Sequence, residues 1–206
     1  MASDDTARVP APLLYLVRHA EVIIRGDREP PEWPLSPQGL EDAHDLARAP
    51  LWSSVALVAS SPEKKTRATA RPIAEAAGLE VRVEPDLREV DRGATPLVSA
   101  DEYHALVAAH FAAPDESVSG WEPAGRASAR VVACIERIAS ESDGPACIVS
   151  HGLVLSHYLA HLRGLDSPSV EEWRAIALPA VAVVDLESRE VRSPFASLME
   201  FMGRAE

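Results

Sequence analysis

Five short apolar stretches are spaced along the chain, and most of them are rich in valine or leucine. They are residues 13–18, 54–60, 79–84, 146–150 and 180–186. Stretches of this length with β-branched side chains favour β-strands. Several of them lack the alternation of polar and apolar positions that marks a half-exposed strand. They therefore predict central strands of a sheet that carries helices on both faces.

Amphipathic segments with apolar residues at helical spacing lie between these stretches. They are residues 36–49, 63–78, 124–142 and 152–164. Ser36 and Pro37 are typical of a helix start, and Gly78 is typical of a helix end. Pro72 predicts a kink in the second of these helices, unless the first part of that segment is short and irregular. The alternation of strands and helices predicts an α/β fold, a three-layer α/β/α sandwich with a mostly parallel central sheet.

The segment of residues 91–123 departs from this alternation. It contains one predicted helix, residues 101–111, between loops that hold proline, serine and glycine. We predict that it is a small insertion that covers a site. Residues 1–12 hold acids and prolines and predict a flexible N-terminal tail. A chain of 206 residues suits one well-packed core, so we expect residues 13–206 to form a single domain.

The net charge of −12 limits the partners that we expect for this chain. It repels phosphate backbones and anionic headgroups, so we expect neither nucleic acid nor membrane as a partner. Cys134 and Cys147 lie in apolar surroundings without metal-ligand spacing, which indicates buried thiols in a reducing compartment. The chain lacks signal-peptide features and any apolar run of about 18 residues. We expect a cytoplasmic protein in which a local basic pocket holds any anionic ligand.

Polar residues follow three predicted strands at the point where each strand ends. Arg18 and His19 follow the first strand, residues 60–67 (SSPEKKTR) follow the second, and His151 follows the fourth. In an open α/β sheet, ligands bind beyond the carboxyl ends of the strands, so we expect these groups to converge. Two imidazoles and several cations in one pocket fit a tetrahedral dianion such as a phosphoryl group.

Five motifs, in their order along the chain, resemble those of a known family. They are LVRHAEV (16–22), LSPQGLEDA (35–43), SSPEKKTRATA (60–70), LREVDRG (87–93) and VSHG (149–152). Over roughly residues 13–186 the chain resembles the histidine phosphatase superfamily, also called phosphoglycerate mutase-like. The resemblance implies the fold of that family and an enzyme that needs neither a metal nor another cofactor.

The resemblance also implies a role for each matching residue. His19 attacks phosphorus and becomes a phosphohistidine. Arg18 and a base from the second motif hold the phosphoryl oxygens, while His151 donates a further hydrogen bond. Glu89 matches the general acid of the family. Side-chain chemistry agrees with this assignment, because a neutral imidazole with a pKa of about 6.5 is a nucleophile near neutral pH.

The chain departs from the family pattern at several positions. In the second motif, register favours Lys65 as the phosphate-binding base over Arg67, which stands two residues later. Arg25 replaces a usual asparagine and is either a further cation for an anionic substrate or a solvated loop residue. Trp121 and Glu122 lie near a substrate contact of some family members. The tryptophan is either a lid contact or a packing anchor.

The predicted function is hydrolysis of a phosphomonoester, on a small phosphorylated molecule, through a phosphohistidine on His19. Two alternatives stay open: a phosphoglycerate-type mutase that uses the same site, and a non-catalytic regulatory module that binds a phosphorylated ligand. Hydrolysis is preferred over the mutase because the stretch between Glu89 and His151 is short for the covering insertion of the mutases. The substrate and the oligomeric state stay open.

Overall fold

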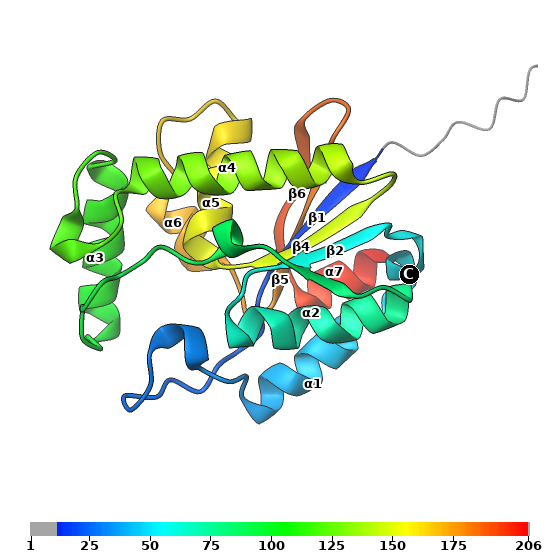
Figure 1. Cartoon of the computed structure of the whole chain (residues 1–206), viewed down its shortest axis with the longest axis horizontal. Helices are drawn as coiled ribbons and strands as arrows, with labels where there is room; N and C mark the ends of the chain where they lie inside the picture. Colours follow the sequence, from blue (N-terminus) through cyan, green and yellow to red (C-terminus); the bar gives the residue numbers. More distant parts are fainter. Residues whose placement is uncertain (1–11, 206) are drawn as a thin grey trace, which may run out of the picture.

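A six-stranded sheet runs through the middle of residues 12–205, the part of the chain that the computed structural model describes (Figure 1). Its strands are β1 (Leu13–Arg18), β2 (Leu57–Ser60), β3 (Val81–Val83), β4 (Ala146–Ser150), β5 (Ala180–Asp185) and β6 (Glu190–Ser197), in the order β3-β2-β4-β1-β5-β6. The first four in this order are parallel, while β5 pairs antiparallel with both β1 and β6. The predicted tail, residues 1–12, lies outside the described residues apart from Pro12.

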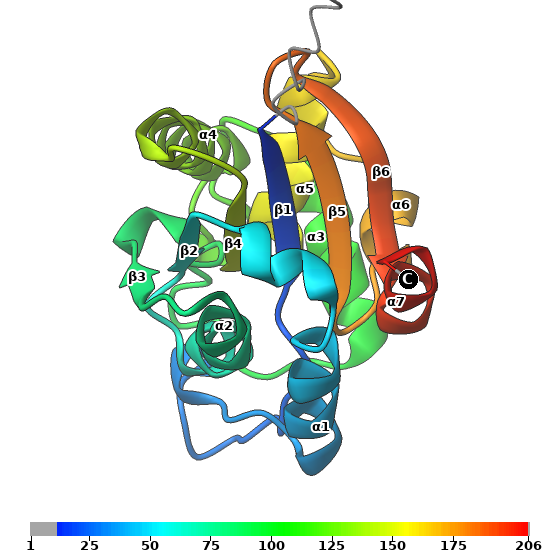
Figure 2. The same ribbon diagram turned by 90° about the vertical axis from the view of Figure 1, so that its right-hand side faces the viewer.

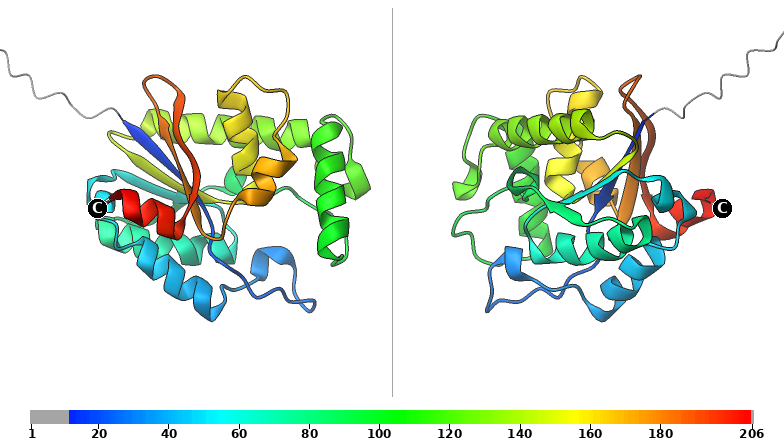
Figure 3. Two further views of the ribbon diagram at one scale, coloured as in Figure 1. Left: turned by 180° about the vertical axis from the view of Figure 1, so that it is seen from behind. Right: turned by 45° about the vertical axis from the view of Figure 1, so that its right-hand side comes forward.

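Helices cover both faces of this sheet (Figures 2 and 3). One face carries α1 (Pro37–Leu46), α2 (Lys64–Ala77) and α7 (Leu198–Ala205), and the other carries α3 (Ala100–Ala112), α4 (Ala124–Glu141), α5 (Gly152–Leu162) and α6 (Val170–Ala175). Short 3-10 helices lie in the connections: η1 (Pro30–Glu32), η2 (Pro50–Ser54), η3 (Pro85–Leu87) and η4 (Val118–Gly120). The predicted three-layer sandwich with a mostly parallel sheet is confirmed.

Side chains of strand β1 pack against the helices on both faces of the sheet. Leu14 and Leu16 are buried in the core beneath α4 and α5, whereas Tyr15 and Val17 are buried in the core beneath α1 and α2. Successive side chains of a strand point to opposite faces. A strand with helices on both sides therefore needs apolar residues at every position, which is why this stretch lacks polar alternation.

Local sequence signals set the ends of two helices as predicted. The hydroxyl of Ser36 accepts a hydrogen bond from the Gly39 N–H at 2.9 Å, and Pro37 occupies the first turn of α1. Gly78 ends α2 with a φ of 68°, in the left-handed region that favours glycine. α2 continues through Pro72 as one helix, and Pro72 and Ile73 are buried.

The structure differs from the sequence-based prediction at the start of β2 and at the β6 edge of the sheet. β2 begins later than predicted because the chain before it forms η2. β6 was not predicted, since most of its side chains are exposed or half-buried at the sheet edge and it has no apolar stretch. The short helix α6 and the C-terminal helix α7 were missed as well. α3 lies in the segment of residues 91–123, as predicted.

Two further findings concern the thiols and the helices. Cys134 and Cys147 are free and buried, and burial raises the pKa of both thiols. In the stretch from residue 12 to residue 205, no helix combines the length and the apolar character needed to cross a membrane.

Candidate active site

The carboxyl ends of β1, β2 and β4 lie side by side at one edge of the sheet. The backbone continues the ladder one residue past each strand. The N–H of His19 donates to the Ser150 carbonyl at 3.1 Å, and the N–H of Ser61 donates to the Val149 carbonyl at 3.2 Å. His151 directly follows β4 and starts α5. The structure thus brings the polar ends of three strands together.

The His19 ring is buried, and its two nitrogens have different surroundings. Nδ1 lies 2.8 Å from the Ala20 carbonyl, which can only accept a hydrogen bond. Nδ1 therefore carries the proton, and Nε2 keeps its lone pair. Burial, followed by the neighbouring His151, holds the pKa of His19 well below its usual range. His19 is thus a neutral imidazole at neutral pH with a lone pair on Nε2.

The His151 ring lies edge-on to the His19 ring, with ring centroids 5.3 Å apart. Its Nε2 lies 2.8 Å from the Ser61 hydroxyl and 3.2 Å from a carboxylate oxygen of Glu63. Its Nδ1 is buried and has no hydrogen-bond partner within residues 12–205. Burial, followed by the charge of Lys65, holds the pKa of His151 well below its usual range. One ring nitrogen of His151 is therefore left for a ligand.

Arg18, the last residue of β1, extends its guanidinium across the start of α5. One of its amino groups donates to the Ile176 carbonyl, and its Nε is buried without a partner in the described part of the chain. A Cβ at Gly152 would lie 3.2 Å from that Nε, so the glycine makes room for the arginine. Burial lowers the pKa of Arg18, but an arginine stays charged at neutral pH.

Lys65 reaches the same edge from the first turn of α2. Its ammonium donates to the Glu63 carboxylate and to the Pro30 carbonyl, the latter at 2.9 Å. It also lies 6.0 Å from the centroid of the Trp33 ring. An ammonium has three N–H donors, so one remains for a ligand. Arg67 is exposed on α2, and the structure does not bring it to the edge.

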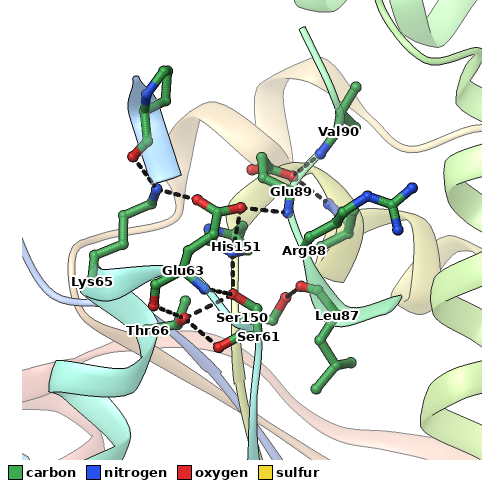
Figure 4. Close-up of polar contacts among 12 residues, drawn as sticks. Ser61, Glu63, Lys65, Thr66, Leu87, Arg88, Glu89, Val90, Ser150 and His151 are labelled. Atoms are coloured by element: carbon green, nitrogen blue, oxygen red, sulfur yellow. Dashed lines mark hydrogen bonds and ion pairs between the residues drawn. The ribbon is translucent and has the colours of Figure 1, made fainter. Parts of the chain in front are cut away.

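Glu63 is a member of this site that sequence reasoning missed (Figure 4). Its side chain is 7% exposed. One carboxylate oxygen accepts from Lys65, and the other accepts from the Glu89 N–H at 2.9 Å and lies 3.2 Å from His151 Nε2. In the sequence, the sole signal is an acid at the start of an otherwise basic stretch, KKTR. The site therefore holds a buried negative charge among its cations.

Glu89 lies against the start of α5. Its carboxylate accepts hydrogen bonds from the N–H groups of Leu153 and Val154, both at 3.2 Å, and from the N–H of Val90 at 3.1 Å. The His151 side chain does not cap α5, so Glu89 satisfies these N–H groups instead. Burial raises the pKa of Glu89, and the hydrogen bond from Val90 opposes that shift.

A family model described as histidine phosphatase superfamily (branch 1) matches residues 14–196. The chain belongs to this superfamily. Its sequence is 29% identical over 166 residues to a Yersinia pestis (strain Pestoides F) protein named probable phosphoglycerate mutase GpmB, with 75% of this chain and 76% of that protein covered. The predicted membership is confirmed.

Solved structures of histidine phosphatase-fold proteins share the architecture of this chain. A mycobacterial glucosyl-3-phosphoglycerate phosphatase with inorganic phosphate has a TM-score of 0.69 at 21% identity, with 91% of this chain and 96% of that chain covered. A mutant phosphoserine phosphatase from Entamoeba histolytica, in complex with phosphoserine, has a TM-score of 0.72 at 17% identity, with 91% and 98% covered. These likenesses confirm the fold.

Three residues named as candidate substrate contacts pair or pack with other side chains in this histidine phosphatase fold. Arg25 is exposed and pairs with Asp27 at 3.1 Å. Trp121 is 1% exposed and belongs to the core beneath α4 and α5, where its ring packs against Tyr103 and His110. Its position is that of a packing anchor.

Glu122 is the third of these residues. Its carboxylate is 6% exposed and pairs with Arg130 of α4 at 2.6 Å and with Arg88 at 3.4 Å. Burial alone would raise the pKa of Glu122, but the hydrogen bond and charge of Arg130, the Asp91 N–H and the charge of Arg88 together outweigh it, and the pKa is lowered. The structure thus places this carboxylate in an ion-pair cluster outside the site.

Arg92 is a further cation that sequence reasoning did not assign. Its guanidinium carbon lies 5.8 Å from the centroid of the Trp33 ring and 5.4 Å from that of the Tyr103 ring. The centroid of the same Trp33 ring lies 6.0 Å from the Lys65 ammonium, which places Arg92 near the site. Across residues 12–205, no group of three or more His, Cys, Asp or Glu side chains could hold a metal ion.

Proposed function

We propose that this chain is a phosphatase that hydrolyses a phosphomonoester of a small molecule through a phosphohistidine on His19. The observation that carries the proposal is the state of the His19 ring: Nδ1 is held by the Ala20 carbonyl, and Nε2 presents a lone pair. Such a ring attacks phosphorus without a separate base. The cations Arg18 and Lys65 at the same edge support the binding of a phosphoryl group.

The first step transfers the phosphoryl group to the enzyme. His19 Nε2 forms a bond to phosphorus, the bond from phosphorus to the ester oxygen breaks, and the leaving alkoxide takes a proton from Glu89. Burial raises the pKa of Glu89, which favours the protonated form that this step needs. Arg18 and Lys65 stabilise the negative charge on the phosphoryl oxygens during transfer.

The second step releases phosphate. A water molecule attacks phosphorus, gives its proton to Glu89, and the bond from phosphorus to His19 Nε2 breaks. The enzyme then returns to its starting protonation state. His151 donates to the phosphoryl group from Nδ1 as a neutral ring, while its Nε2 accepts from the Ser61 hydroxyl. No metal ion takes part in this scheme.

Mutase activity is a second candidate, since curated relatives at 29% identity are named phosphoglycerate mutases. A mutase shares the first step but returns the phosphoryl group to another oxygen of the substrate. A non-catalytic phospho-ligand module is a third candidate. The pairing of Glu63 with Lys65 favours it, because the pair neutralises one cation of the site.

Turnover of p-nitrophenyl phosphate in EDTA, with His19→Ala as the blank, tests the proposal. We expect phosphate release that EDTA leaves unchanged and that His19→Ala abolishes. Quenched reactions should contain an acid-labile, alkali-stable phosphoryl adduct on His19. Equal rates in the two proteins, or the absence of this adduct, would overturn the mechanism. With 3-phosphoglycerate, formation of 2-phosphoglycerate without free phosphate would identify a mutase.

A further inference from the structure

The Glu63 carboxylate contacts three groups of the site at once. It accepts from the Lys65 ammonium and from the Glu89 N–H, and it lies 3.2 Å from His151 Nε2. Because Lys65 and His151 are the groups proposed to bind the phosphoryl oxygens, Glu63 occupies part of their hydrogen-bonding capacity. When no phosphoryl group is bound, the Glu63 carboxylate is thus the anion that contacts Lys65 and His151.

A bound phosphoryl dianion would bring a second anion to the same donors. Lys65 has one N–H left and His151 has Nδ1 left, so a phosphoryl group can bind beside Glu63 without displacing it. The Glu63 side chain is 7% exposed, so water cannot screen the repulsion between the two anions. Two acidic groups that share one buried site do not both stay ionised.

Other charged groups around Glu63 could respond to the same ligand. They are Lys65 of α2, His151 at the start of α5, Glu89 after η3, Arg18 and His19 at the end of β1, and Arg92. Lys65, Arg18 and Arg92 are already cations, so they cannot take up a proton. Burial holds the pKa of His19 and that of His151 well below the usual range, so both rings stay neutral. Glu89 is the proposed general acid and already carries the proton that it donates, so it cannot take up another. Glu63, which shares Lys65 and His151 with the ligand, is the acid closest to those donors.

We propose that Glu63 is a positioning residue that holds Lys65 and His151 in the free protein and takes up one proton from solvent when a phosphoryl group binds. The inference concerns the phosphate-binding site on which the proposed function rests. The neutral carboxyl then offers an O–H donor in place of a negative charge. Binding of a tetrahedral dianion should therefore be linked to proton uptake and should weaken as pH rises.

Calorimetric titration with sulfate tests this linkage, because sulfate is a tetrahedral dianion that does not itself titrate near neutral pH. Measurements in two buffers with different ionisation enthalpies give the number of protons taken up. We expect about one proton per sulfate in the unaltered protein, and a sulfate Kd that rises by up to about tenfold per pH unit. An uptake near zero in the unaltered protein would overturn the proposal.

Variants assign the proton to one residue. We expect Glu63→Gln to remove the uptake and to tighten sulfate binding about tenfold, and Glu63→Asp to keep the uptake. Glu89→Gln is the matched control and should still take up about one proton. If Glu63→Gln keeps the uptake, or if Glu89→Gln loses it, the assignment is wrong. Because sulfate is not turned over, a protein that binds it in this way but releases no phosphate would contradict the proposed function alone.

Discussion

Glu63 and Glu122 are both buried carboxylates that pair with a basic side chain, yet their surroundings differ. Around Glu122, Arg130 donates to both carboxylate oxygens and to backbone carbonyls of Asp86, Arg88 and Glu89, so every group has a partner. Around Glu63, the neighbouring His151 Nδ1 has none within residues 12–205. Burial and charge are alike in the two clusters. The two ion pairs therefore differ in what is left beside them: the pair of Glu63 lies next to a ring nitrogen that can still bind a ligand, and the pair of Glu122 and Arg130 is satisfied by the protein itself.

The largest expected effect concerns catalysis at Glu89, whose N–H donates to Glu63. Glu89→Gln removes the general acid and should lower kcat by about 10²- to 10⁴-fold. The raised pKa of Glu89 places the alkaline limb of kcat where this acid loses its proton, and the variant should lose that limb. The lowered pKa of His19 keeps the nucleophile unprotonated to well below pH about 6.5. A pH–rate profile checks both limbs; an unchanged alkaline limb in Glu89→Gln contradicts the role.

The next effect concerns stability at the Glu122 cluster. Glu122→Ala leaves Arg130 buried without its carboxylate partner and should lower the free energy of unfolding by about 3–5 kcal/mol. Urea denaturation measures this loss. Glu116→Ala, at an exposed position in the same segment, is the control and should change the free energy of unfolding by less than about 0.5 kcal/mol. Similar losses in both variants would show that the cluster adds no stability.

A smaller effect separates Lys65 from Arg67. Lys65→Met removes a cation from the site and should raise KM for an aryl phosphate about tenfold or more. Arg67→Met removes the same charge from the exposed face of α2 and should leave KM within about twofold. Steady-state kinetics of the two variants decide between the residues. The reverse order of effects would assign phosphate binding to Arg67.

The smallest effect concerns the outer cations. Arg92→Gln removes a charge that acts on Glu89 and His151, and we expect KM for an aryl phosphate to rise about threefold. Arg25→Gln is the matched control, since Arg25 is exposed and pairs with Asp27. It should change KM by less than about twofold. Equal KM values for the two variants would mean that Arg92 contributes no more than a solvated arginine.

The fold and the central residues of the site could be predicted because they follow from local patterns. Apolar runs identify β1, β2 and β4, and residues that follow parallel strands must meet at one edge, as His19 and His151 do. β6 could not be predicted in this way, because its pairing with β5 at the edge of the sheet leaves its side chains largely uncovered.

The remaining side chains depend on contacts between distant segments. Trp121 lies close in sequence to a family motif, but its ring packs into the core against Tyr103. Glu63 precedes α2, and its contacts come from His151 and from the N–H of Glu89. No periodicity or spacing in one segment reports which way such side chains point. The role of an acid such as Glu63 inside a basic stretch can be assigned only when its neighbours in the structure are known.

The hydrogen bond from His19 Nδ1 ends on a main-chain oxygen, that of Ala20. A partner of this kind is supplied by every amino acid, so exchanging the side chain at that position leaves the acceptor in place. The backbone conformation at residues 19 and 20 therefore fixes the tautomer of His19. Side chains around His19 could therefore change during evolution without loss of the hydrogen bond that fixes its tautomer.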